Sequence, residues 1–129
     1  YTKVLGELYR TQLNPTISYL HEPGERRFSL SLDFAEVFKP LIGDRLIFSL
    51  LNRNQIMENS FTKELNFLHL KKDASKLIVS ELESRLKKTV MHKELGRQVS
   101  YQYLIRLEAY KLIKHLIGEK EYEGFRIWW

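Results

Sequence analysis

Residues 28 to 40 form the most informative segment of the chain. It reads Phe28-Ser29-Leu30-Ser31-Leu32-Asp33-Phe34-Ala35-Glu36-Val37-Phe38-Lys39-Pro40. In a helix of this sequence the apolar side chains point in nearly every direction, which is typical of a helix buried inside a domain. Ser29, Asp33 and Glu36 interrupt the apolar pattern at spacings that place them on one narrow polar stripe. The sequence therefore predicts a buried helix from about Phe28 to Phe38 with two carboxylates on one side.

Two carboxylates held close together in a buried setting repel each other, so the pair needs a metal ion, an arginine or a proton. His21 stands shortly before the helix, across a loop whose Pro23 and Gly24 let the chain turn back. A histidine with carboxylates and without cysteine suits Mg²⁺ or Mn²⁺, with positions left for water and phosphate oxygens. Such a cation would stabilise charge on a phosphoryl group in transfer and position its attacker.

A structural interpretation of the same residues stays open at this stage. Either carboxylate could pair with a neighbouring basic side chain, namely Arg26, Arg27 or Lys39, and His21 could form a hydrogen bond within its loop. Structural ion pairs also perturb buried carboxylates. The residues alone thus leave two hypotheses: a metal-dependent catalytic site, or a non-enzymatic helical DNA-binding or interaction domain with structural carboxylate ion pairs.

Nearly every other periodic segment has helical spacing, and the alternation typical of strands is scarce. We therefore predict an all-α fold, a single domain of about five to seven helices. The further helices are expected up to about residue 13 and over residues 41 to 52, 73 to 91 and 99 to 117, and residues 61 to 67 are the best candidate for a short extended piece. Asn14-Pro15 should end the first helix, and Pro40 should mark a break or the first turn of the next. Gly118 fits the position that follows a helix end.

Length and composition limit the class of protein. The chain has 129 residues, 43% of them apolar, and no cysteine. These values suit one domain with a core and exclude disulfide bonds and thiolate-bound zinc. Without a signal peptide or a long apolar run, a reducing cytoplasmic setting is the default expectation. Residues 1 to 9 already read as mid-helix, so the start of this helix and any preceding domain are expected upstream of the chain.

The positive charge lies in the second half of the chain. Residues 1 to 60 hold seven Lys and Arg against seven Asp and Glu, whereas residues 61 to 129 hold fourteen against nine, which accounts for the net charge of +5. Seven of these basic residues gather around one expected helix: Lys71, Lys72, Lys76, Lys87, Lys88, Lys93 and Arg97. They form either an ordinary solvated face or a track for the DNA backbone.

Two runs of residues resemble the signature of a known family. The first is Thr16-Ile17-Ser18-Tyr19-Leu20-His21-Glu22-Pro23-Gly24, and the second is the stretch from Phe28 to Pro40. Both are similar to the CRISPR-associated spacer-acquisition integrases, the endonuclease family numbered one among the CRISPR-associated proteins. Asp44-Arg45 and the run Leu50-Leu51-Asn52-Arg53 resemble the family's continuation. The resemblance covers residues 1 to 129 as the C-terminal catalytic domain of a larger two-domain protein, and residues 14 to 53 carry it specifically.

The resemblance implies a metal-dependent DNA endonuclease or integrase of CRISPR adaptation. Its chemistry would join the 3′-hydroxyl of prespacer DNA to a CRISPR repeat by phosphodiester transfer, in defence against viruses and plasmids. The implied cofactor is Mg²⁺ or Mn²⁺. The implied partners are prespacer and repeat DNA, a second copy of the chain as a homodimer, and the second CRISPR-associated adaptation subunit; no membrane is involved.

The resemblance also assigns roles to individual residues. His21 and Glu36 match the family's metal-binding histidine and carboxylate, and Asp33 matches an adjacent acidic position in the active site, as an auxiliary ligand or a positioning residue. Lys39 falls on a basic position next to DNA, and the further DNA-binding candidates are Arg26 and Arg27. The family's third metal ligand is a glutamate upstream of the matched region. Glu7, the one carboxylate shortly before the histidine, does not match it.

Overall fold

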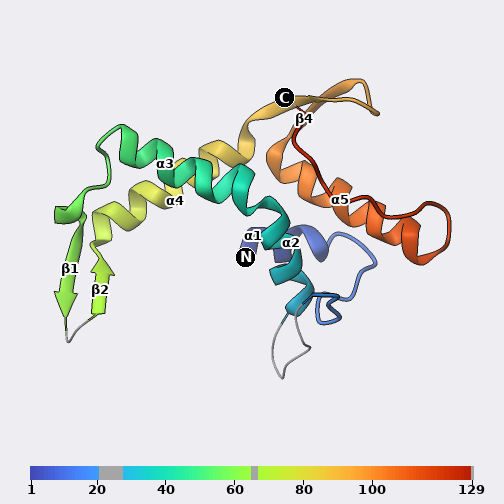
Figure 1. Cartoon of the computed structure of the whole chain (residues 1–129), viewed down its shortest axis with the longest axis horizontal. Helices are drawn as coiled ribbons and strands as arrows, with labels where there is room; N and C mark the ends of the chain where they lie inside the picture. Colours follow the sequence, from blue (N-terminus) through green and yellow to red (C-terminus); the bar gives the residue numbers. More distant parts are fainter. Residues whose placement is uncertain (21–27, 65–66, 129) are drawn as a thin grey trace.

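The computed structural model describes residues 1–20, 28–64 and 67–128. In chain order the elements are α1 (Thr2–Leu8), α2 (Ser29–Lys39), a π-helical turn (Pro40–Asp44), α3 (Arg45–Asn52), a 3₁₀ turn (Glu58–Ser60), β1 (Phe61–Glu64), β2 (Phe67–Leu70), α4 (Lys72–Lys87), β3 (Thr89–His92), β4 (Arg97–Ser100) and α5 (Tyr101–Leu116). Figure 1 shows them as a central group of helices with a long extension. Every helix in the described ranges is too short or too polar to span a lipid bilayer.

The prediction of an all-α fold is wrong, because the chain contains two antiparallel β-hairpins. β1 pairs with β2, and β3 pairs with β4. β3 occupies residues that the sequence assigned to the end of a long helix. The backbone of Lys88 turns extended at φ −57° and ψ 142° and ends α4, and the β-branched Thr89 and Val90 that follow favour a strand. The extended piece expected at residues 61 to 67 is confirmed, since it contains β1.

The main hydrophobic core is built by α1, α2 and α5, together with the π-helical turn, the end of α4 and β4. Its buried members are Val4, Leu8, Leu30, Phe34, Phe38, Leu41, Ile42, Leu86, Val99, Tyr101, Leu104, Ile105, Ala109 and Leu112. We call α1, α2, α5, the β3–β4 hairpin and the C-terminal segment (residues 119–128) the body. Because α2 carries apolar side chains around most of its circumference, it lies at the centre of the body, as the sequence predicts.

The aromatic C-terminal segment packs back on the body. The ring centroids of Phe125 and Phe38 are 4.9 Å apart, and the indole Nε1–H of Trp128 donates a hydrogen bond of 3.1 Å to the carbonyl oxygen of Met91. The turn into this segment begins at Gly118, which has φ +75° and donates its N–H to the His115 carbonyl. The predicted position of this glycine after a helix end is therefore confirmed.

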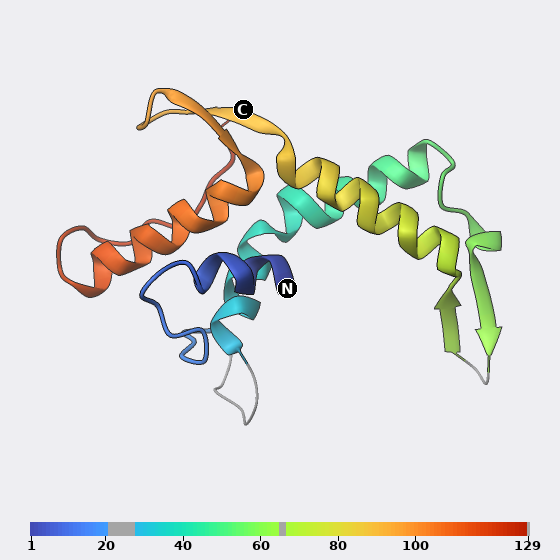
Figure 2. The ribbon, with the colours of Figure 1, turned by 180° about the vertical axis from the view of Figure 1, so that it is seen from behind.

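A second region extends from the body. α3 and α4 lie side by side in both views (Figures 1 and 2), and the β1–β2 hairpin lies at their far end. Their contact is a small cluster in which Leu46, Leu50 and Ile56 are buried. We call α3, α4 and the β1–β2 hairpin the arm.

One nearly continuous helical run connects the body to the arm. Pro40 does not end it, because Lys39, Pro40 and Arg45 all keep right-handed helical dihedral angles. Proline has no N–H to donate, and its ring crowds the preceding turn, so the wider π-helical turn accommodates it. Pro40 thus lies in the first turn of the next helical segment, one of the two predicted outcomes. The first helix ends earlier than predicted, at Leu8.

Candidate catalytic site

Asp33 links the buried helix α2 to the chain that leads into His21. Its side chain is 5% exposed, and its Oδ2 accepts hydrogen bonds from the backbone N–H groups of Tyr19 at 2.8 Å and Leu20 at 3.2 Å. Hydrogen bonds from backbone amides to a carboxylate are charge-assisted and strong. Asp33 therefore fixes the backbone immediately before His21. His21 lies outside the described residues.

Glu36 lies one helical turn beyond Asp33 but in a different environment. Asp33 is buried, whereas Glu36 is exposed. The sequence predicted that both carboxylates would lie on one polar stripe of a buried helix. In the structure Asp33 is buried and Glu36 reaches solvent. The accessible carboxylate in this pair is Glu36.

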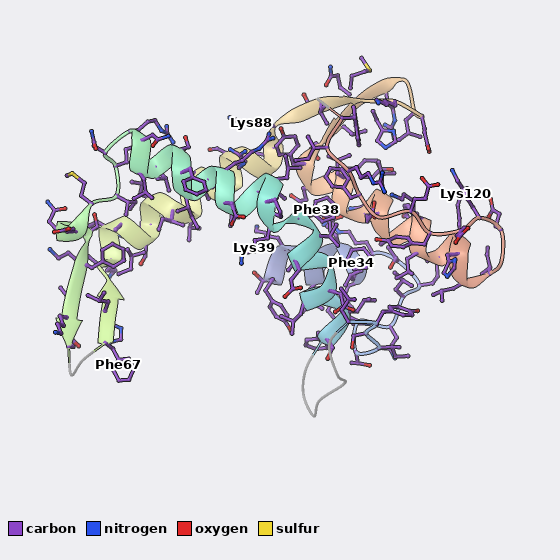
Figure 3. All side chains as sticks on the ribbon, viewed as in Figure 1. Phe34, Phe38, Lys39, Phe67, Lys88 and Lys120 are labelled. Atoms are coloured by element: carbon purple, nitrogen blue, oxygen red, sulfur yellow. The ribbon has the colours of Figure 1, made fainter. Side chains whose placement is uncertain are left out.

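Lys39 and the two arginine candidates complete the predicted set. Lys39 is exposed, and Figure 3 shows its side chain leaving α2 on the side away from Phe34 and Phe38. Within the part of the chain that the structure describes, Lys39 forms no salt bridge with either carboxylate. An ion pair between Lys39 and Asp33 or Glu36 is thus not observed. Arg26 and Arg27 lie outside the described residues.

The described residues supply part of a cation site. Within residues 1–20, 28–64 and 67–128, no three side chains of His, Cys, Asp or Glu come together. The donors on α2 are the accessible carboxylate of Glu36 and, one turn earlier, Asp33. Carboxylate oxygens are the ligands that Mg²⁺ and Mn²⁺ prefer. The donor type fits the predicted cation, and His21 and an upstream glutamate would have to complete the site.

A buried ion pair that the sequence analysis did not predict joins α1 to α5. Glu7 is 1% exposed. It accepts hydrogen bonds from Gln102 Nε2 at 2.7 Å and Arg106 Nε at 2.8 Å, and Arg106 Nη2 lies 2.7 Å from the same carboxylate. Both carboxylate oxygens are therefore occupied by structural partners. The available signal was the position of Glu7 between the apolar Val4 and Leu8, which places a charge on a core-facing side.

A second buried carboxylate holds the C-terminal segment. Glu108, 2% exposed, accepts a hydrogen bond of 2.7 Å from the hydroxyl of Tyr122 and one of 2.8 Å from Lys111 Nζ. Burial, together with the hydrogen bond to Glu108 and the negative charge of Glu108, raises the pKa of Tyr122 far above its usual range. Tyr122 therefore stays protonated and donates to Glu108 throughout the physiological range.

Comparison with known proteins shows the family to which the chain belongs. The family described as "CRISPR associated protein Cas1" matches residues 1–84. The chain belongs to this family, and the resemblance seen in the sequence is confirmed.

The individual relatives agree with this assignment. The chain is 70% identical over all 129 residues to the CRISPR-associated endonuclease Cas1 of Fusobacterium nucleatum and covers 38% of that protein. It is 54% identical over 129 residues to a CRISPR-associated endonuclease Cas1 of Moorella thermoacetica and covers 40% of it. The chain thus spans about two fifths of the length of the curated relatives it matches.

Two solved structures share the fold. A Cas1 protein from Thermotoga maritima has a TM-score of 0.84 and 49% identity, over 93% of this chain and 37% of the other. A casposase bound to an integration product has a TM-score of 0.82 at 24% identity, over 97% of this chain and 38% of the other. The second likeness is one of fold alone.

Proposed function

We propose that this chain forms the metal-binding half of the catalytic site of a DNA endonuclease and integrase of CRISPR adaptation. The observation that carries the proposal is the 70% identity, over all 129 residues, to a protein named as a CRISPR-associated endonuclease. The proposed reaction is the insertion of prespacer DNA into the CRISPR repeat array by phosphodiester transfer. The hydrogen bonds that Asp33 accepts from the backbone before His21 support the proposal, because a catalytic side chain must be held in position by its surroundings.

In the proposed site His21 and Glu36 hold a divalent cation, Mg²⁺ or Mn²⁺, together with a glutamate from an upstream segment. When bound, such an ion would neutralise charge on a phosphodiester and position the attacking hydroxyl. Asp33 acts as a positioning residue. Its Oδ2 accepts hydrogen bonds from the amides of Tyr19 and Leu20 and so orients the backbone that leads to His21. The exposed Lys39 adds positive charge for the DNA backbone next to Glu36.

The proposed activity requires DNA and further protein subunits as partners. DNA would bind as prespacer and as repeat, and the protein would assemble as a homodimer with the second CRISPR-associated adaptation subunit. The excess of basic residues in the second half of the chain supports a polyanionic substrate, since bound Lys and Arg release counterions from DNA. DNA affinity is therefore expected to fall steeply as salt is raised.

Alanine substitution of the two proposed ligands in the full-length protein tests the assignment. His21→Ala or Glu36→Ala should lower the integration rate at least about 100-fold, because several kcal/mol of charge stabilisation are lost. The matched controls are His69→Ala on β2 and Glu123→Ala in the C-terminal segment, two exposed residues of the same types. Circular dichroism should show the same helix content in all four variants. Unchanged integration in the His21 or Glu36 variant would overturn the assignment.

Metal titration separates catalysis from the non-enzymatic alternative. In the full-length protein, Mn²⁺ should broaden the imidazole resonances of His21 through paramagnetic relaxation, and the Glu36→Ala variant should need at least about tenfold more metal. The resonances of His69 should stay sharp in both proteins. If no ion binds at His21 when the upstream glutamate is present, a helical DNA-binding or interaction domain is the correct description.

A further inference from the structure

A cationic pocket lies in the arm, where α3 packs against α4, and its residues have no part in the proposed catalytic site. Its volume is about 160 Å³, and its polar lining consists of Ser49, Arg53, Glu81, Ser84, Arg85 and Lys88. Figure 3 shows Lys88 where α4 passes into the β3–β4 hairpin. Of the seven basic residues that the sequence analysis grouped around this helix, Lys88 alone lines the pocket. We call it the α3–α4 pocket.

Both arginines of the pocket are oriented by hydrogen bonds to other groups of the protein. Arg85 donates hydrogen bonds from Nε at 3.1 Å and Nη2 at 3.0 Å to the carbonyl oxygen of Leu41, in the π-helical turn. Arg53 donates from Nε to the Ser49 carbonyl at 3.2 Å and from Nη2 to Glu81 Oε2 at 2.8 Å. A guanidinium group has five N–H donors. Each arginine is therefore oriented and keeps N–H groups, including those of Nη1, without a partner among the described residues.

Positive charge in the pocket exceeds negative charge. Three cations, Arg53, Arg85 and Lys88, face one carboxylate, Glu81. Lys88 forms no salt bridge with any residue that the structure describes. Burial lowers the pKa of Arg85, Tyr101 raises it by a smaller amount, and the nearby positive charge of Arg45 lowers it again. An anion in the pocket would compensate this crowding of cations.

We propose that the α3–α4 pocket binds a phosphate group. Its volume of about 160 Å³ is well above the roughly 10–15 Å³ needed for one water molecule, so it leaves room for a tetrahedral oxyanion. Oriented guanidinium groups match phosphate oxygens, and the hydroxyls of Ser49 and Ser84 are further donors. The phosphate comes from a nucleic-acid backbone or from free inorganic phosphate. The nucleic-acid source rests on the proposed function, and there the pocket would position DNA without reading its sequence.

DNA binding by the full-length protein, measured by fluorescence anisotropy over a range of salt concentrations, tests the pocket. Lys88→Gln should weaken binding about three- to tenfold and reduce the slope of log K against log salt by about one. Lys87→Gln is the matched control, because Lys87 is the adjacent lysine, is also exposed and lies outside the pocket lining. It should change the affinity by less than about twofold. Equal effects of the two substitutions would contradict a DNA phosphate in the pocket.

Glu81→Gln should change the affinity for anions in the direction opposite to Lys88→Gln. It removes the one carboxylate of the pocket and releases Arg53 from its ion pair, so it should tighten anion binding about threefold. If Glu81 only forms the ion pair with Arg53, the substitution should lower the stability of the arm and should not raise the affinity for anions. Urea denaturation of the same variant measures that loss separately.

Titration with inorganic phosphate separates the two sources. Phosphate should shift the Nε–H resonances of Arg53 and Arg85, and it should do so in Lys87→Gln but less in Lys88→Gln. Shifts with phosphate and no effect of Lys88→Gln on DNA affinity would assign free phosphate as the ligand. No shifts and no selective effect of Lys88→Gln or Glu81→Gln would overturn the proposal. Lys88→Gln and Glu81→Gln should leave Mn²⁺ binding at His21 unchanged. The proposal for the pocket and the proposal for the catalytic site can therefore be refuted separately.

Discussion

The body and the arm differ in how much apolar surface holds them together. Fourteen apolar side chains are buried in the main core, whereas three are buried in the cluster of the arm. The two hairpins repeat the difference: β4 buries Val99 in the main core, but every residue of β1 is exposed. Burial is the dominant favourable term in folding. The body therefore has the stability to position Asp33, while the arm is a weakly anchored extension that carries the cationic pocket.

The helical run through α2 and α3 shows the same difference within one element. α2 buries Phe34 and Phe38 in the body, and α3, a few residues later, leaves Ile47, Phe48 and Leu51 exposed. Leu86 of α4 is buried in the main core and anchors the near end of the arm. Two polar contacts add to it. Arg85 binds the carbonyl of Leu41, and Lys3 of α1 forms a salt bridge with Glu83 of α4. Four experiments, given in order of decreasing expected effect, test whether the body and the arm differ in this way.

The largest effect is expected from a leucine-to-alanine substitution made once in the body and once in the arm. Leu8→Ala in α1 should lower the free energy of unfolding by about 4 kcal/mol, and Leu50→Ala in α3 by about 2 kcal/mol, because a small cluster relaxes more easily around the cavity. Both leucines are almost fully buried, at 0% and 2% exposure. Urea denaturation followed by circular dichroism measures both losses. A larger loss for Leu50→Ala would mean that the arm is as firmly packed as the body.

Amide hydrogen exchange should separate the two hairpins by roughly 100-fold in protection, equivalent to about 3 kcal/mol in opening free energy. Amides in β3 and β4 should be the protected ones, because Val99 is buried in the main core and Trp128 donates a hydrogen bond to Met91. Amides in β1 and β2 have mostly exposed neighbours. Mass spectrometry of short exchange times resolves the two segments. Equal protection would remove the distinction between them.

Breaking an ion pair should cost more in the body than in the arm. Arg106→Met leaves the buried charge of Glu7 with the neutral Gln102 and with Arg10, whose Nη1 lies 3.5 Å from Oε1, and should cost about 2–3 kcal/mol. Arg53→Met breaks the pair with Glu81, whose two side chains are 47% and 31% exposed, and should cost less than about 1 kcal/mol. Urea denaturation at pH 7 compares the two. The double variant Arg106→Met with Glu7→Leu should recover most of the loss; no recovery would mean that packing, not charge, explains it.

The smallest effect concerns the C-terminal segment at high pH. An unfolded tyrosine loses its proton near pH 10, whereas the raised pKa of Tyr122 keeps the folded side chain protonated. The contribution of Tyr122 is therefore fully present below about pH 10 and is lost as the pH rises further. The loss should stay below about 1 kcal/mol at pH 11, because the side chain is only partly buried. Thermal unfolding from pH 9 to pH 11 should be less pH-dependent in Tyr122→Phe.

Much of the local structure could be predicted from the sequence. The buried helix α2, the helices α4 and α5 and the turn at Gly118 follow from periodicities of three to four residues, which depend only on nearby side chains. The hairpins were harder to predict, because each strand has only four residues, which is too short for an alternating pattern to stand out in the sequence. The family resemblance also lay in local motifs around residues 14 to 53.

The helical periodicity, the family and the residue types of the candidate site can all be obtained from the amino-acid sequence. Which residues contact one another follows only from the tertiary structure. It placed Oδ2 of Asp33 against amides 13 and 14 positions away, and it paired Glu7 with Arg106, which lies 99 positions along the chain. It also brought Arg53 of the loop after α3 and Arg85 of α4 into one pocket. Such partners meet only after the chain has folded, because the hydrophobic packing of distant segments, and not the local sequence pattern, sets their separation.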